Sequence, residues 1–283
     1  MNSLSRRSLL GLAAAAPLAS FLMSATKIPV GLELYSVRDD LRNDLNGTVR
    51  AVAKMGYQIV EFFAPYYAWT TAQTKDVKKL LDDLGIKCLS THNDAKNFQP
   101  ENLGRTAELN HILGTRYAVM ASAGRVQGAP GWHAVADTLN HAAEQWKGSG
   151  LRPGYHNHQT EFTAGLLDSD RERPMDLLAA NTHKEVMLQF DVGTCVEVGS
   201  DPVAWINANP GRIRSMHCKD WAPGPGKGYR VLFGEGAVPW KAIFDAAEKT
   251  GGIEYYLIEQ EGSDLPAMET ADRCLANFRR IHP

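Results

Sequence analysis

Residues 152–162, RPGYHNHQTEF, determine how the rest of this sequence is interpreted. The segment begins as a short apolar strand and ends in two histidines with a carboxylate close behind. Side chains alternate between the two faces of a strand, so we expect His156 and His158 on one face and Tyr155 and Asn157 on the other. Two imidazoles on one face at a strand end contribute little to packing but can bind a metal ion. The segment therefore predicts a metal site at the end of a strand.

Short β-rich runs alternate with longer helical runs eight times from residue 28 onward. The alternation predicts parallel βαβ units, and eight units in about 255 residues fit a (β/α)8 TIM barrel, an α/β fold, as one domain over residues 26–283. A doubly wound open sheet is the alternative, but no GxGxxG motif follows the first strand. The predicted strands are residues 29–37, 59–63, 86–92, 115–122, 152–158, 186–192, 213–220 and 254–261. The predicted helices are residues 45–55, 77–84, 103–113, 133–146, 175–181, 203–207, 240–249 and 267–281.

Composition excludes several classes of protein. The 283 residues are 44% hydrophobic and 22% charged, so the chain can bury a large core and is not a mostly disordered one. The formal net charge of −2 gives no basic face of the kind that captures nucleic acid, and we expect no nucleic-acid partner. The four cysteines contain no CxxC pair, so we expect free, mostly buried thiols, with a disulfide as the alternative that their even number leaves open. They are Cys88, Cys195, Cys218 and Cys274.

The N-terminal 25 residues have the order of an export signal: two arginines, a short apolar run and then small residues. The apolar run is too short and too rich in alanine for a membrane span. We therefore expect residues 1–25 to be a twin-arginine signal, and the mature protein to be periplasmic and not embedded in the membrane. A disordered or interfacial N-terminal helix is the alternative. The resemblance to twin-arginine signals lies in Ser5, Arg6, Arg7, Leu9 and Leu10.

Polar residues fall late in the predicted strands. Catalytic groups of a barrel enzyme sit at the C-terminal strand ends, whereas inward positions lower in the strands are filled with bulky side chains. One such polar residue is most simply structural, but nine buried charged groups at corresponding positions need partners or a metal. The nine residues are Glu33, Glu61, His92, His156, His158, Asp191, His217, Lys219 and Glu259.

Four of these residues suit one divalent ion, because two imidazoles and two carboxylates on neighbouring strands give a mixed nitrogen and oxygen shell. Such a shell favours Mn, Co, Zn or Fe over Mg or Ca, and leaves positions for substrate oxygens or water. On the fifth strand, His158 or Glu161 is the alternative ligand. An internal salt-bridge network without metal is the other interpretation. The predicted ligands are His156, Asp191, His217 and Glu259.

The remaining polar and aromatic residues suggest roles around this ion. His92, Glu61 and His158 are candidate acids or bases, and Lys219 can bind a hydroxyl or stabilise an enolate, unless it only pairs with Asp220 or Glu261. The glycine- and proline-rich loop at residues 221–236 is a candidate lid or substrate wall. Candidate substrate contacts, including tryptophans that can stack on a sugar ring, are Glu33, Trp69, Trp221 and Glu235.

From residue 28 to the C-terminus, the sequence resembles the xylose isomerase-like TIM barrels. This superfamily of sugar (phosphate) isomerases and epimerases includes inosose dehydratase and endonuclease IV. The resemblance implies one divalent metal at the ends of strands five to eight. In the ketose epimerases the ligands are Glu, Asp, His and Glu, and the two glutamates also move the proton. The matching segments are GLELYSVRDD (31–40), GYHNHQTEF (154–162), FDVGT (190–194), HCKD (217–220) and FGEG (233–236) followed by VPW (238–240).

Carried onto this sequence, the last three ligands become Asp191, His217 and Glu259, and the first falls on His156. With one of the two carboxylates replaced, a two-base epimerisation loses a base, and a reaction on one face of the substrate becomes more attractive. We still expect an isomerase- or epimerase-type enzyme that abstracts a proton next to a carbonyl of a keto sugar or polyol. The base is Glu259, or else Glu61 or His158, and His92 or Lys219 is the proton donor.

Two other functions remain open. One is a lyase or hydratase (dehydratase) acting on 3-keto sugars or 3-keto glycosides. The other is a non-catalytic periplasmic sugar-binding protein. Endonuclease activity is not expected, because it needs more metal ligands and a basic groove. Barrels of this type often pair, so a homodimer is an open alternative.

Overall fold

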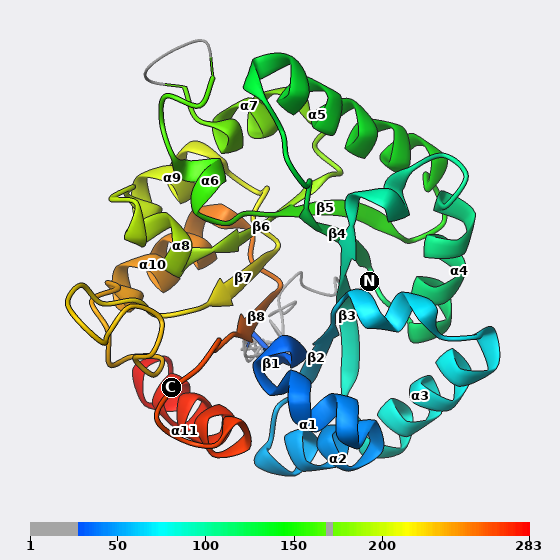
Figure 1. Ribbon diagram of the computed structural model, residues 1–283, viewed down its shortest axis with the longest axis vertical. Helices are drawn as coiled ribbons and strands as arrows, with labels where there is room; N and C mark the ends of the chain where they lie inside the picture. The colour runs from blue at the N-terminus through cyan, green and yellow to red at the C-terminus, as the bar shows by residue number, and fades with distance from the viewer. Residues whose placement is uncertain (1–27, 168–171) are drawn as a thin grey trace, which may run out of the picture.

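A closed barrel of eight parallel strands forms the centre of the molecule (Figure 1). The computed structural model describes residues 28–167 and 172–283, so the predicted export signal at residues 1–25 lies outside the described residues. The strands pair in chain order, and β8 pairs with β1 to close the ring. Helices surround the barrel on its outside. The predicted (β/α)8 barrel is confirmed, and the alternative of an open sheet is wrong.

The strands coincide with the eight predicted runs, but several end earlier than expected. The predicted strand at residues 29–37 stops at Glu33, because the 3-10 turn η1 begins at Leu34. The one at residues 152–158 stops at His156, shortly before α6 begins at Gln159. The polar strand-end residues therefore lie at the turns out of the sheet. The strands are β1 Val30–Glu33, β2 Ile59–Phe62, β3 Lys87–Asp94, β4 Tyr117–Ser122, β5 Arg152–His156, β6 Met187–Asp191, β7 Ser215–Cys218 and β8 Tyr255–Ile258.

The eight predicted helical runs are all helical, and several short helices lie at the strand ends as well. The longer helices are α2 Leu45–Met55, α3 Thr71–Leu84, α4 Leu103–Leu113, α5 Gly128–Gln145, α7 Pro174–Asn181, α9 Pro202–Ala208, α10 Trp240–Ala246, which continues into the π-helix η4 Ala247–Gly251, and α11 Ala267–Ile281. The short helices are α1 Arg38–Asn43, α6 Gln159–Phe162, α8 Val192–Glu197 and the 3-10 turns η1 Leu34–Val37, η2 Ala64–Ala68 and η3 Ala95–Phe98.

Helix α3 shows how the sequence builds the outer ring. Thr70 and Gln73 form a capping box at its start, in which each side chain bonds the backbone N–H of the other residue. Val77, Leu80 and Leu81 recur at helical spacing and are buried. The opposite face of α3 carries lysines and aspartates in the solvent. This amphipathic pattern holds the helix against the barrel.

Apolar side chains fill the lower part of the barrel interior. Gly31 of β1 has no room for a side chain there, because a Cβ atom would lie 2.7 Å from the Ile59 Cβ atom. The positions two residues after Ile59, Met187 and Leu257 face the same side, and there the side chains are polar. The apolar cluster is Ile59, Tyr117, Val119, Met187, Tyr255 and Leu257. The polar residues above it include Glu61, Gln189, His217 and Glu259.

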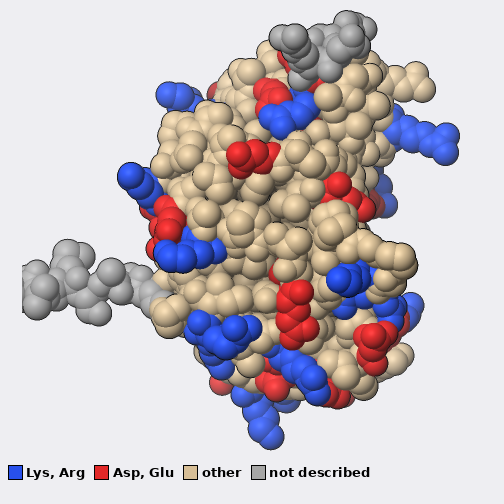
Figure 2. Space-filling model, turned by 90° about the vertical axis from the view of Figure 1, so that its left-hand side faces the viewer, with Lys and Arg blue, Asp and Glu red and all other residues tan. Residues whose placement is uncertain are grey.

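The outside of the molecule carries mixed charge. On the face drawn in Figure 2, basic and acidic side chains are interspersed over the surface. Among the described residues, no helix combines the length and the apolar character needed to cross a bilayer. The four cysteines are buried and free, as predicted.

Candidate functional site

A cavity of about 440 Å³ opens at the C-terminal ends of the strands. Its lining combines acidic side chains with imidazoles contributed by β1, β3, β5 and the segment after β8. This is the end of a parallel barrel where catalytic groups are found in TIM-barrel enzymes. The ionisable residues that line it are Glu33, His92, Asp94, His156, His158, Glu259 and Glu261.

The four predicted metal ligands lie together at this mouth. His156, Asp191 and Glu259 each offer one ligand atom, and these atoms all lie within 4.8 Å of one another. The Nε2 atom of His156 is 3.9 Å from Oδ2 of Asp191. His217 joins the group through Nδ1, which lies 2.7 Å from Oε2 of Glu259. The four side chains come from β5, β6, β7 and the residue after β8.

These residues fit a divalent cation. The Nδ1 atom of His156 is buried and has no hydrogen-bond partner among the described residues. A buried nitrogen without a partner is costly unless something binds it. The set also mixes imidazole and carboxylate, which suits Mn, Co, Zn or Fe. The donor chemistry of this set therefore fits a cation site at this mouth, where the Nε2 atom of His156 faces Asp191.

Glu161, the alternative ligand on this segment, is occupied elsewhere. Its Oε1 atom accepts a hydrogen bond from the Tyr155 hydroxyl at 2.7 Å, and its Oε2 atom accepts one from the His158 backbone N–H at 2.8 Å. Glu161 therefore fixes the turn after β5 on the outer side of the barrel. His158 is half-buried and lies at the mouth, with its ring 4.9 Å from that of His156. The alternation predicted for this segment is thus observed.

Asn157 locks the ends of β5 and β6 together, a role that sequence reasoning did not find. Its amide donates to the Asp191 backbone carbonyl at 3.1 Å and accepts from the Asp191 N–H at 2.9 Å. Asp191 itself caps α8, because its Oδ1 atom accepts from the Thr194 N–H at 3.1 Å. The other oxygen, Oδ2, faces His156 and Lys219. One carboxylate thus serves both the helix and the candidate metal site.

His217 is held between two carboxylates. Its Nδ1 atom contacts Glu259 at 2.7 Å and its Nε2 atom contacts Oε2 of Glu61 at 2.8 Å. Burial alone lowers the pKa of His217, but the hydrogen bonds to Glu259 and Glu61 outweigh it and raise that pKa to about 10. Burial likewise raises the pKa of Glu61, and the nearby His92 and His217 lower it to about 2. Glu61 is therefore a carboxylate at neutral pH.

Lys219 lies deep in the site and contacts three carboxylates. Its Nζ atom is 3.3 Å from Oδ2 of Asp191, 3.5 Å from Oε1 of Glu259 and 2.5 Å from Oε1 of Glu261. Burial lowers the pKa of Lys219, but the charges of Asp191, Glu259 and Glu261 raise it well above its usual value. Lys219 therefore stays an ammonium group that can donate hydrogen bonds. Of its two predicted simple ion pairs, the one with Glu261 forms.

Gln189 connects the two halves of the barrel interior. Its Nε2 atom donates to Oε1 of Glu61 at 2.9 Å, and its Oε1 atom lies 2.6 Å from Nε2 of His92. Burial lowers the pKa of His92, so its ring is neutral near pH 7. Burial, followed by the charges of Glu61 and Glu259, raises the pKa of Glu33 well above its usual value. The interior thus holds carboxyl groups whose pKa values are shifted in opposite directions.

Asp220 organises the long loop after β7, and sequence reasoning did not find this role. This buried carboxylate accepts hydrogen bonds from the backbone N–H groups of Trp221, Gly234 and Gly236 at 2.8, 2.7 and 3.2 Å. It also accepts from the indole Nε1 of Trp240 at 2.9 Å. The loop is therefore folded back onto the barrel. The only signal in the sequence was the HCKD motif, where Asp220 follows the two site residues.

Three of the predicted substrate contacts lie outside the mouth cavity. Glu235 is exposed and accepts a hydrogen bond from Nδ2 of Asn277 on α11 at 3.2 Å, because Asp220 folds the loop toward that helix. Trp221 is half-buried and is not among the residues that line the cavity. Trp69 lines a neighbouring cavity. Glu33 does line the mouth, as expected.

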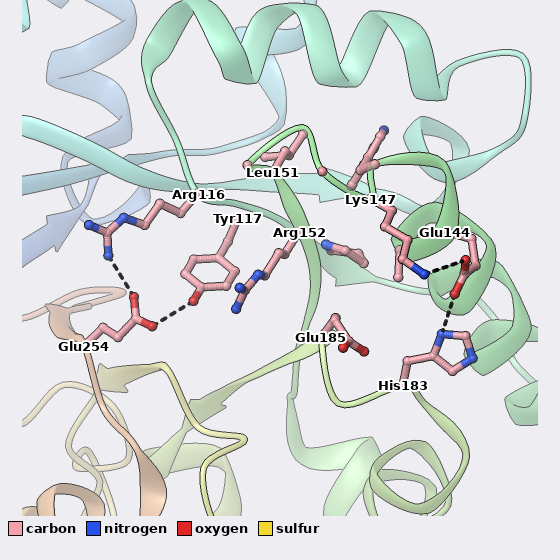
Figure 3. A pocket seen from close by; sticks show the side chains of 14 residues that line it. Arg116, Tyr117, Glu144, Lys147, Leu151, Arg152, His183, Glu185 and Glu254 are labelled. Carbon is pink, nitrogen blue, oxygen red and sulfur yellow. Dashed lines mark hydrogen bonds and ion pairs between the residues drawn. The ribbon is translucent and has the colours of Figure 1, made fainter.

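A larger cavity of about 610 Å³ lies at the opposite end of the barrel (Figure 3). Its charged groups are largely paired: Glu254 binds Arg116 at 3.1 Å and the Tyr117 hydroxyl at 3.0 Å, and Glu144 contacts His183 at 3.5 Å. Residues at the N-terminal face of a barrel generally support stability. The cluster of imidazoles and carboxylates at the other end remains the candidate site.

A closed barrel with clustered imidazoles and carboxylates at the C-terminal ends of its strands has the layout of a TIM-barrel enzyme. The chain belongs to the xylose isomerase-like TIM barrel family, whose family profile matches residues 49–280. The predicted resemblance is thereby confirmed.

Two related proteins show the range of this family. The rhizopine catabolism protein MocC of Rhizobium meliloti is 26% identical over 224 residues, which cover 67% of each protein. The inosose dehydratase of Lacticaseibacillus casei is 24% identical over 145 residues, which cover 46% of this chain and 47% of the relative. The chain thus spans about half the length of that relative.

Among solved structures, a sugar phosphate isomerase/epimerase from Parabacteroides distasonis ATCC 8503 has a TM-score of 0.75 at 26% identity. The match covers 95% of this chain and 99% of the other. The chain therefore lies in a superfamily of sugar isomerases, epimerases and inosose dehydratases.

Proposed function

We propose that this protein is a divalent-metal-dependent enzyme of the isomerase or epimerase type, which moves a proton on a carbon next to a carbonyl of a keto sugar or polyol. The observation that supports this most directly is the grouping of His156, Asp191 and Glu259 at the mouth of the barrel, with His217 in contact with Glu259. The Lys219 ammonium group lies within 3.5 Å of two of these side chains. A substrate in the mouth cavity meets donors, acceptors and a cation site together.

The same four side chains would hold the metal. A divalent ion bound there would act as a Lewis acid on a carbonyl oxygen and a neighbouring hydroxyl of the substrate, which makes the adjacent C–H group more acidic. Lys219 and Glu261, which pair with each other, would bind hydroxyl groups of the substrate beside it. The apolar cluster below the site would keep water away from its inner side.

Among the three candidate bases, the geometry favours Glu259. Glu259 lines the cavity. Burial raises its pKa, but Lys219 and His217 lower that pKa by more, so Glu259 is a carboxylate at neutral pH. Glu61 does not line the cavity, and both of its oxygens are engaged, one by Gln189 and one by His217. Glu61 is better suited to orient His217. His158 lines the cavity and could act as a second base.

Lys219 and His92 are the candidate proton donors. Lys219 is an ammonium group beside Glu259, so it can donate to a substrate oxygen as the base removes the proton. His92 lines the same cavity from the opposite side of the barrel, and its neutral ring can pass a proton on. A base and a donor on different strands suit a proton transfer between carbon and oxygen.

A lyase or dehydratase reaction is the second candidate, and one specific residue favours it. His156 stands where the ketose epimerases have a glutamate, so Glu259 is the only carboxylate among the four ligands that also lines the cavity. A single carboxylate base suits proton removal and loss of a leaving group on one face. The similarity to an inosose dehydratase supports the same candidate. Its substrates would be 3-keto sugars or 3-keto glycosides.

The decisive experiment combines elemental analysis with isotope exchange. The purified protein should contain about one divalent ion per chain, and a chelator should abolish turnover of keto sugars. Deuterium uptake at the α-carbon without loss of a group would identify an isomerase or epimerase, whereas release of water or an aglycone would identify a lyase. Full activity of the metal-free protein would refute the proposal. Sugar binding without turnover that Glu259→Gln leaves unchanged would indicate a binding protein instead.

We also propose that residues 1–25 direct the folded protein to the periplasm through the twin-arginine route. The sequence Ser5-Arg6-Arg7 followed by Leu9 and Leu10 supports this. Changing both arginines to lysine should leave the protein in the cytoplasm. Cell fractionation of a Gram-negative host tests this, and export of the double variant would contradict it.

A further inference from the structure

A third cavity, of about 500 Å³, lies beside the mouth, between η1 with α1 on one side and η2 on the other. Tyr35 and Phe63 line both cavities, so the two share a wall. We call this cavity of about 500 Å³ the side groove. It is defined by Tyr35, Arg38, Leu41, Leu45, Phe63 and Trp69.

The side groove has an aromatic floor. Phe62 and Tyr66 are buried beneath it, and the half-buried Trp69 packs edge-on against both, at ring-centroid distances of 5.1 and 6.0 Å. Tyr35 is 38% exposed and packs edge-to-face on Phe63 at 5.2 Å. Tyr35 and the half-buried Trp69 therefore present aromatic surface to the side groove, next to the mouth cavity.

The rim of the side groove is polar. The Arg38 guanidinium lies over the Tyr35 ring at 4.5 Å and donates to the Tyr35 carbonyl at 3.0 Å. Arg42 and Asp39 form an exposed pair beside it. Guanidinium and carboxylate groups bind hydroxyls, whereas the aromatic floor offers an apolar surface. A flat ring with apolar faces and a polar edge matches both parts of this lining.

The two cavities together exceed what a single sugar ring needs. The mouth holds about 440 Å³ and the side groove about 500 Å³. Together they have the size of a site for a drug-sized ligand, which generally measures about 300–1,000 Å³. A monosaccharide bound at Glu259 and His156 would leave the side groove unfilled. An extended substrate would use both cavities.

We propose that the substrate is a glycoside, with the reacting sugar ring in the mouth and a flat aglycone, either a second sugar ring or an aryl group, in the side groove. This inference rests on the proposed function and names its substrate class. Trp69 and Tyr35 contact the aglycone, and Arg38 or Arg42 binds polar groups at its edge. The sharing of Tyr35 and Phe63 by the two cavities favours this occupant over a second copy of the chain.

Calorimetric titration with unreactive probes tests the groove independently of catalysis. The probes are 4-nitrophenyl β-D-glucopyranoside, the disaccharide cellobiose and methyl β-D-glucopyranoside, titrated into the metal-loaded full chain. At least one of the two larger glycosides should bind about tenfold more tightly than the methyl glycoside. The stronger of the two identifies the aglycone as aryl or sugar. Equal dissociation constants for all three probes, or no binding of any, would overturn the inference.

Two variants locate the preference. Trp69→Ala and, separately, Tyr35→Ala should reduce the ratio between the larger and the methyl glycoside to near one, while Trp69→Phe should retain part of it. Leu166→Ala is the matched control, because Leu166 is an exposed apolar side chain outside both cavities. Since Tyr35 is partly exposed, its variant should fold even if Trp69→Ala does not. An unchanged ratio in Tyr35→Ala would overturn the inference.

Self-association is the competing explanation, and sedimentation of the same proteins tests it. If the wild type dimerises and Tyr35→Ala is monomeric, the side groove is an interface and the inference is wrong. The proposed function can fail separately. A preference for the larger glycosides without turnover of any keto sugar would support the aglycone site and contradict the proposed function. Turnover of keto sugars without this preference would contradict only the aglycone site.

Discussion

His217 contacts Glu61 through Nε2 at 2.8 Å while its Nδ1 atom lies 2.7 Å from Glu259. One imidazole thereby links β7 to β2 across the barrel interior and to the residue after β8. A carboxylate behind a ligating histidine fixes the ring orientation and tautomer, and it makes the ring a stronger ligand. Glu61 is fully buried, and its second oxygen accepts from Gln189. These contacts suit a positioning residue better than a catalytic base.

Replacing Glu61 with Gln should weaken metal binding without removing a ligand. The amide is a weaker hydrogen-bond acceptor for the His217 ring than the carboxylate, so we expect the affinity for the metal to fall about 10–100-fold. Metal titration monitored by elemental analysis measures this. Excess metal should restore most of the turnover, because the base is still present.

The exposed Glu101 provides the matched control, since Glu101→Gln makes the same chemical change on the surface. Normal metal affinity in Glu61→Gln together with turnover that excess metal does not restore would show that Glu61 is the base instead.

Two substitutions at Asp191 separate its two roles. Asparagine keeps the N-cap of α8 but loses the charge, whereas alanine loses both. We expect both variants to lose the metal, and Asp191→Ala to be about 1 kcal/mol less stable than Asp191→Asn. Urea unfolding of the metal-free proteins and metal content per chain measure the two effects. A full metal content in Asp191→Asn would exclude Asp191 as a ligand.

Replacing Lys219 with Met should reduce turnover and leave the metal in place. The variant keeps most of the length of the side chain but removes the ammonium donor beside Asp191 and Glu259. We expect kcat to fall about 10²–10⁴-fold, the usual contribution of a positioned proton donor. Lys241→Met on the surface of α10 is the control. Unchanged kcat would remove Lys219 from the mechanism, and loss of metal would assign it a structural role.

Glu33 makes stability depend on pH. Burial and the charges of Glu61 and Glu259 raise its pKa well above 4.5, so the folded state keeps a proton that the unfolded chain releases. Stability therefore falls as pH rises above about 4.5, by about 1.4 kcal/mol for each pKa unit of difference, until the folded pKa is reached.

Glu33→Gln removes this dependence. Its stability relative to the wild type should increase between pH 5 and pH 8, as measured by urea unfolding of chelator-treated proteins. A difference that stays constant over this range would contradict the shifted pKa of Glu33. Glu61 has the opposite sign, because its pKa is lowered, and its stabilisation is lost as pH falls from about 4.5 toward about 2.

The barrel and the meeting of the four candidate ligands were predictable from the sequence. Strand alternation places His156 and Asp191 inward, and closure of a parallel ring brings all eight strand ends together. The FDVGT motif also has a structural cause. A Cβ atom at Gly193 would lie 2.6 Å from the Lys219 carbonyl oxygen, so glycine lets α8 approach the end of β7.

The positions of Glu235 and Trp221 were not predictable, because a single distant contact decides them. Asp220 binds backbone N–H groups 14 and 16 residues further along the chain and folds the loop toward α11. Local sequence patterns do not indicate which donors a buried carboxylate selects. The role of Gln189 was not predictable for a related reason. Strand alternation predicts that Gln189 points into the barrel, but it does not predict that Gln189 contacts Glu61 and His92.

Because Glu259 follows the last strand, the four groups come together only once β8 has paired with both β7 and β1. A nascent chain that still lacks this strand has three of the four groups and no complete chelate. Any ion held there would therefore favour the closed ring over every partly assembled form, by about 2.7 kcal/mol when its concentration is 100 times the dissociation constant. The metal ion would then stabilise the completed barrel selectively, in addition to its part in the chemistry.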